Sequence, residues 1–153
     1  MKIQIFIISF ALLIVTSCSR SRNESAQNAN DTAALAPASS EEISGVYFVN
    51  LKDGDKVKSP VIIQMGVHGM SIEPAGKVNE GKGHHHIIID GSFIEKGQAV
   101  PMDKTHLHFG KGQVTDTLKL NPGGHTLTLQ FADGVHASYG KDWSKTIAIT
   151  VLE

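Results

Sequence analysis

Histidine is concentrated in two short segments of this sequence. Eight histidines occur in 153 residues, and five of them lie in residues 84–86 (HHH) and 106–108 (HLH). Alternate residues of a β-strand share one face and lie about 6.5–7 Å apart. Two imidazoles spaced in this way can therefore converge on one metal ion. If both segments are strands, the spacing predicts a metal site.

The primary candidate ligands are two pairs of histidines with one residue between them: His84, His86, His106 and His108. If the two strands are adjacent, they supply four neutral nitrogen ligands without any cysteine, a set that suits zinc and cupric copper equally. We therefore expect one copper or zinc ion. His85 points to the other face of its strand, so its loss should leave metal binding unchanged. The alternative is a solvated, histidine-rich sheet face that binds no metal.

Other residues could complete or tune this site. His68 and Met70 lie at the end of an expected strand, His136 lies in a glycine-flanked loop, and methionine sulfur would favour cuprous copper. Asp90 has the strand phase of the first histidine pair and is better placed to orient a ligand than to bind the ion. His125 shares the phase of an apolar strand, so we expect it to be structural, with its ring bonded to nearby backbone.

The elements that must position these side chains are short strands. The apolar residues alternate with period two, and no window of a dozen residues has the pattern of an amphipathic helix. The expected strands, each bounded by turn residues, are 46–51, 61–67, 85–89, 105–109, 114–120, 125–131 and 146–151. Seven short strands in a domain of this size favour an all-β fold, an immunoglobulin-like β-sandwich of antiparallel strands. A small β-barrel is the alternative.

The N-terminus has the layout of an export signal. Lys2 is the only charge before a largely apolar run over residues 3–15, which is shorter than the roughly 20 residues of a spanning helix. Residues 15–18 (VTSC) resemble the lipobox of bacterial lipoproteins, so we expect residues 1–17 to be removed and Cys18 to carry lipid. Ser19 does not signal retention in an inner membrane. We therefore expect a lipid-anchored protein of the cell envelope, in the outer membrane where the host has one.

A change of composition divides the remaining chain. Residues 18–42 have few large apolar side chains and are expected to form a flexible tether that follows the lipidated cysteine. Residues 43–153 are expected to form a single β-sandwich domain. Removal of residues 1–17 leaves 13 basic and 15 acidic side chains, a formal charge of −2 with no run of either sign. This weak, evenly distributed charge does not suggest nucleic acid as a partner. The expected partners are the membrane, through the lipid on Cys18, and a metal ion.

Several segments together resemble the bacterial exported family known as domain of unknown function 4399. The resemblance spans the domain and implies a compact extracytoplasmic β domain with the histidine segments as its signature, but no established chemistry. The segments that carry the resemblance are 45–54 (GVYFVNLKDG), 66–70 (GVHGM), 83–91 (GHHHIIIDG), 106–113 (HLHFGKGQ) and 122–129 (PGGHTLTL).

A weaker likeness is to copper–zinc superoxide dismutases, which also use His-x-His on a strand of a β-sandwich. This chain lacks that family's cysteine pair and its arginine after the last histidine loop. Motifs of hydrolytic enzymes such as Gly-x-Ser-x-Gly and His-Glu-x-x-His do not occur. We therefore expect a non-enzymatic, membrane-anchored copper- or zinc-binding module for storage, sensing or transfer. An envelope scaffold or interaction domain, and a metalloenzyme with a histidine-liganded metal, are the alternatives.

Overall fold

The structure is a computed structural model and describes residues 44–153. The predicted signal peptide, the predicted lipidation at Cys18 and the predicted tether lie outside the described residues. Within residues 44–153 the chain forms nine β-strands and one 3-10 helix, η1 (Lys141–Trp143), and no α-helix. In this part of the chain no helix has the length and apolar character needed to cross a membrane.

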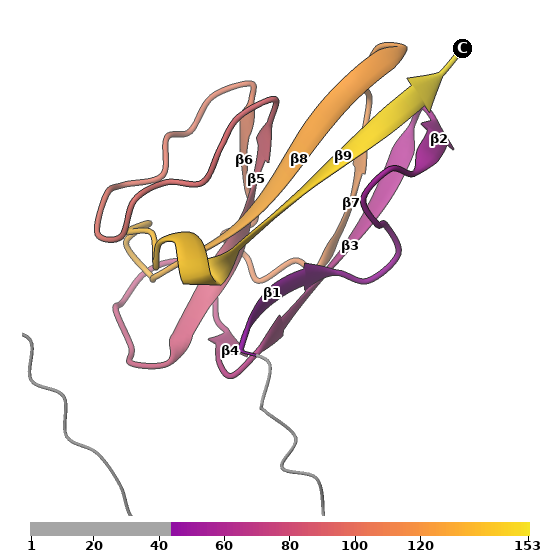
Figure 1. Cartoon of the computed structure of the whole chain (residues 1–153). Coiled ribbons are helices and arrows are strands. Elements are labelled where there is room, and N and C mark those ends of the chain that lie inside the picture. The colour runs from indigo at the N-terminus through magenta and orange to yellow at the C-terminus, as the bar shows by residue number, and fades with distance from the viewer. Residues whose placement is uncertain (1–43) are drawn as a thin grey trace, which may run out of the picture. The chain divides into compact units, whose positions relative to one another are not determined.

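Two sheets make up the fold (Figure 1). The smaller sheet has the order β1-β3-β7 and is antiparallel, with β1 (Gly45–Phe48), β3 (Val61–His68) and β7 (Thr115–Leu118). The larger sheet has the order β2-β9-β8-β5-β4, and β6 also pairs with β5. Its strands are β2 (Lys56–Lys58), β4 (Ser71–Ile72), β5 (Lys82–Ile89), β6 (His106–His108), β8 (Gly123–Ala132) and β9 (Ser144–Leu152).

The predicted all-β sandwich is confirmed, and each of the seven expected strands is present. The apolar pattern does not predict β2 and β4, because strands of three and two residues are too short to show alternation. Both pair in parallel with a neighbour, β2 with β9 and β4 with β5, so the larger sheet is not wholly antiparallel as expected.

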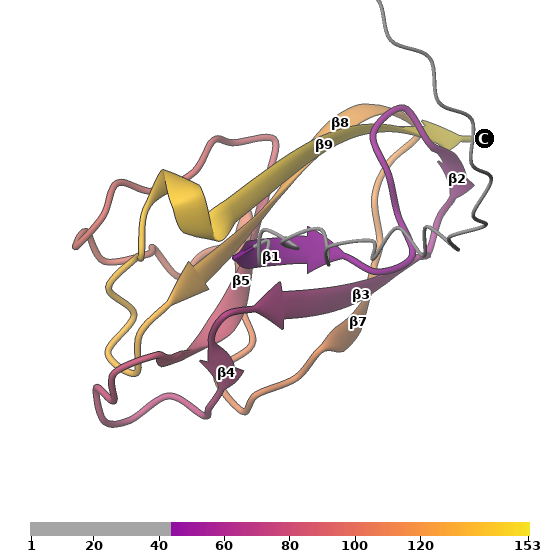
Figure 2. The same ribbon diagram turned by 60° about the horizontal axis from the view of Figure 1, so that its bottom comes forward.

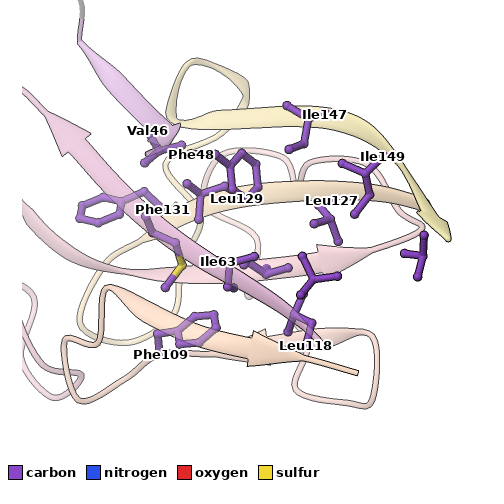
Figure 3. Close-up of a cluster of buried hydrophobic side chains, with 14 residues drawn as sticks. Val46, Phe48, Ile63, Phe109, Leu118, Leu127, Leu129, Phe131, Ile147 and Ile149 are labelled. Atoms are coloured by element: carbon purple, nitrogen blue, oxygen red, sulfur yellow. The ribbon is translucent and has the colours of Figure 1, made fainter. Parts of the chain in front are cut away.

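The hydrophobic core lies between the two sheets (Figure 3). The alternation predicted for β3 is present, because Ile62 is 56% exposed while Ile63 beside it is completely buried. Burial of each large aliphatic side chain stabilises the fold by about 1.5–3 kcal/mol. The core side chains of β3 and β8 are Val61, Ile63, Met65, Leu127, Leu129 and Phe131.

The strand β5 is buried on both faces. One face carries Ile87 and joins the core between the sheets. The other face is covered by two connections, residues 90–105 and 133–140, which lie side by side in Figures 1 and 2 and are joined by a bridge between Ala99 and Ala137. Gln130 of β8 holds both, because its amide oxygen accepts the N–H of residue 94 and its amide nitrogen donates to the carbonyl of residue 140. His84 and His86, which share this second face, therefore lie under an ordered cover.

Candidate metal centre

Strand register brings three histidines to one place. His84 and His86 alternate with the core residue Ile87 and so share the face of β5 that points away from the core. The antiparallel strand β6 places His108 directly opposite His86. Residues directly opposite each other in a sheet share a face, and their side chains touch. Three imidazoles from two strands therefore meet under the covering connections.

The atoms that meet are the Nε2 nitrogens. His84 Nε2 lies 3.1 Å from His86 Nε2 and 3.2 Å from His108 Nε2. The three rings offer nitrogen atoms that all lie within 4.8 Å of one another. Around a tetrahedral zinc ion with Zn–N distances of 2.0–2.1 Å, neighbouring nitrogens would be about 3.3 Å apart. The observed spacing is thus close to that of ligands around one ion.

A fourth imidazole comes from the connection between β8 and η1. His136 Nε2 lies 3.1 Å from His108 Nε2. The centre of its ring is 4.6 Å from that of His108, 5.1 Å from that of His84 and 5.9 Å from that of His86. The sequence predicts His136 only as an additional ligand, because a loop residue has no register from which its position follows. In the structure it stands beside the three strand histidines.

The structure does not bring His106 to this group, contrary to the sequence prediction. His106 lies opposite Ile88, two residues beyond the position that pairs His108 with a histidine. Its Nδ1–H donates instead to the carboxylate of Asp103 at 2.9 Å, and this bond is the main reason why the pKa of the Asp103 carboxyl is lowered. The two His-x-His pairs are therefore offset by two residues, so that only His86 and His108 lie opposite each other.

Other contacts hold three of the additional candidates. His68 is exposed and stacks on the ring of Tyr47, with ring centres 4.6 Å apart. Met70 is partly buried and packs against the hydrophobic core. Asp90 accepts hydrogen bonds from the ring of His125 and the backbone N–H of Thr126, and not from His84 or His86, which it was expected to orient. The donor set that the structure assembles therefore consists of imidazoles.

The structural role expected for His125 agrees with its contacts. Its Nδ1 lies 2.9 Å from an oxygen of the Asp90 carboxylate, and its Nε2 lies 3.0 Å from the carbonyl oxygen of Asn121. Both partners are acceptors, so both ring nitrogens must carry a proton. The pKa of His125 is accordingly raised, above all by the bond to Asp90. This charged pair joins the end of β5 to the start of β8.

Burial keeps the clustered imidazoles neutral. His84 and His86 are completely buried, and the loss of hydration is the largest cause that lowers their pKa values to about 4 and about 2. Neighbouring imidazoles lower both values further. The pKa of the partly exposed His108 is lowered by burial and by His136. At neutral pH these three rings are in the unprotonated form that binds a metal.

The second nitrogen of each buried ring has no partner. Nδ1 of His84 and Nδ1 of His86 are buried without a hydrogen bond to any residue of the described part. In most metal sites this atom donates to a carboxylate or a carbonyl, and loss of such a partner lowers metal affinity 10- to 100-fold. Among the described residues, the two rings are therefore held by packing and by the contacts of their Nε2 atoms, without a partner at Nδ1.

Gly110 lies directly against the ring of His108, and this contact gives a test that substitutes none of the clustered histidines. A β-carbon at position 110 would overlap Cε1 and Nε2 of His108. In Gly110→Ala we expect the half-exposed imidazole to swing aside, with a loss of copper or zinc affinity of at least about 10-fold. Titration calorimetry measures the affinity, and the thermal midpoint of the metal-free protein should stay near that of the wild type.

Gly124→Ala is the matched control for this substitution, because a β-carbon there meets no atom within 4 Å. Its metal affinity should equal that of the wild type. Equal affinity in Gly110→Ala as well would show that the position of the His108 ring does not matter for binding.

The histidine cluster lies within the part of the chain that matches a known family. The family model described as "Domain of unknown function (DUF4399)" matches residues 63–152, which include all four clustered histidines. Comparison with curated proteins and with solved structures finds no significant match. The chain belongs to the DUF4399 family, as its sequence motifs predict.

Proposed function

We propose that this domain is an extracytoplasmic metal-binding module for copper or zinc, anchored to the membrane by lipid on Cys18, which stores, senses or transfers the ion in the cell envelope. The observation that carries the proposal is the meeting of Nε2 atoms from His84, His86 and His108, with His136 beside them. The anchor and the location rest on the sequence of residues 1–18 alone.

The chemistry of the donors supports zinc or cupric copper. Neutral imidazole nitrogens suit both ions, whereas cuprous copper prefers sulfur ligands. Met70, the methionine that could supply a thioether, packs against the core. An imidazole set of this kind therefore gives no preference for cuprous copper.

The number of ligands separates storage or transfer from catalysis. A catalytic zinc site usually has three protein ligands and an open position for water or substrate. Four imidazoles would close the coordination shell, which favours storage or transfer. A metalloenzyme is the second candidate, because the three strand histidines lie within 4.8 Å of one another and could hold an ion alone.

Metal analysis of the purified protein tests the proposal. The full chain, prepared without a histidine tag, should contain or take up one equivalent of copper or zinc with a Kd of about 1 μM or tighter, measured by elemental analysis and titration calorimetry. A merely histidine-rich surface would bind several ions weakly. If neither metal binds at micromolar concentration, the proposal is rejected, and an envelope scaffold domain becomes the better description.

A further inference from the structure

The four clustered histidines differ in how they are held. His84 and His86 lie in β5 and are completely buried, whereas His108 at the end of β6 and His136 are partly exposed. An ion can reach the cluster only from its exposed side, so the latter two residues form its outer edge. Of the four, only His136 lies outside a strand. Its position therefore depends on the connection that carries it.

Asp133 organises this connection. Its Oδ1 accepts the backbone N–H groups of Val135 at 2.9 Å and of Ala137 at 2.8 Å. Its carbonyl oxygen accepts the N–H of His136 at 3.0 Å, and its own N–H donates to the carbonyl of Ala137 at 2.9 Å. Four hydrogen bonds from one residue thus close a tight loop around His136.

The backbone of His136 is in a conformation that glycine adopts more readily than any other residue. Its φ is 71°, in the left-handed region that costs energy for residues other than glycine. Such strain persists only where the surroundings impose it, and it gathers at functional sites. Here the loop bonds of Asp133 and a bond from the N–H of Val100 to the carbonyl of His136 impose it.

We propose that Asp133 is a positioning residue that holds His136 as the outer, releasable ligand of the ion bound by the three strand histidines. This inference rests on the proposed metal-binding function. With His136 in place the ion has four nitrogen ligands. When the loop moves, three ligands remain, and the vacated position admits a ligand group from a chelator or an acceptor. The loop thereby sets the rate at which the ion leaves.

Three variants of the full chain test this role with cupric copper as the probe. In Asp133→Ala and in His136→Gly, electron paramagnetic resonance should show one nitrogen ligand fewer than in the wild type. Release of copper to excess EDTA should be at least about 10-fold faster. Asp133→Asn should retain the wild-type spectrum and release rate, because the amide oxygen can accept the same two backbone N–H groups.

His136→Gly also separates loss of the ligand from loss of the fold. Glycine adopts positive φ freely, so the metal-free variant should melt at or above the wild-type temperature although it releases copper faster. Retention of the wild-type spectrum and release rate in His136→Gly would overturn the inference. Retention of both in a folded Asp133→Ala would overturn the role of Asp133. Loss of a nitrogen in Asp133→Asn, where only the charge and one donor change, would overturn its hydrogen-bonding role.

The wild-type spectrum distinguishes this inference from the function on which it rests. Copper bound by three nitrogens in the wild type would overturn the inference about His136 and leave a metal-binding module. If elemental analysis finds that neither copper nor zinc is bound, both are overturned.

Discussion

The substitution His84→Ala is expected to abolish tight binding of copper or zinc. His84 is central to the cluster, because its Nε2 contacts those of both His86 and His108. Its loss removes a direct ligand and should weaken binding by more than the 10- to 100-fold that accompanies loss of an outer hydrogen-bond partner. Titration calorimetry of the full chain measures the change. His86→Ala should behave in the same way.

His106→Ala is the matched control for these variants. It removes the same type of side chain from β6, but this imidazole donates to Asp103 and pairs with no clustered histidine. Its metal affinity should therefore equal that of the wild type. His85→Ala should also leave the affinity unchanged, because its ring lies against Phe131 of the core. If all four variants bind equally weakly, the histidines act as a diffuse surface and not as one centre.

Acid is expected to destabilise the metal-free protein from about pH 6.5 downward, before most carboxylates begin to titrate. Burial is the main cause that lowers the pKa values of both His84 and His85 from 6.5 to about 4. The unfolded chain therefore takes up these protons near pH 6.5, and the folded chain only near pH 4. Stability is complete above pH 6.5 and falls between these values. At 1.36 kcal/mol per pKa unit, His85 alone would account for a loss of roughly 3 kcal/mol.

Urea unfolding at pH 7.5, 6, 5 and 4 with EDTA present measures this loss. The variant His85→Leu is the sharpest comparison, because both ring nitrogens of His85 are buried without partners among the described residues. It removes one titrating group from the core, so its free energy of unfolding should fall less between pH 7.5 and pH 4. A wild-type free energy that stays constant over this range would contradict the neutral burial of these histidines.

The faces of the strands could be predicted from the sequence, but their register could not. Alternation correctly separates His85 from its two neighbours and places Leu107 toward the core. The relative shift of β5 and β6 depends on a long connection and on a pairing of only three residues. A single strand pattern contains no information about that shift. For this reason the sequence wrongly predicts that His106 joins the histidine cluster. In the structure His106 lies opposite Ile88.

Two other residues show where strand phase stops being informative. Asp90 follows the last residue of β5 and has a φ of 56°, so the alternation that assigns it to His84 and His86 has already ended. Its carboxylate reaches His125 instead. His136 joins the cluster from a loop, and the only local signal is the turn-forming pair of Asp133 and Gly134 before it. Contacts between a loop and a distant strand depend on the packed fold.

Because β5 supplies Ile87 to the core and His84 and His86 to the cluster, an ion bound there would couple occupancy of the cluster to the stability of the fold. An ion at 100 times its Kd would stabilise the native state by about 2.7 kcal/mol. Proteases act on the unfolded fraction, which that free energy lowers about 100-fold. The lifetime of the protein would then follow the supply of the ion, and its abundance would record the metal status of the compartment around it.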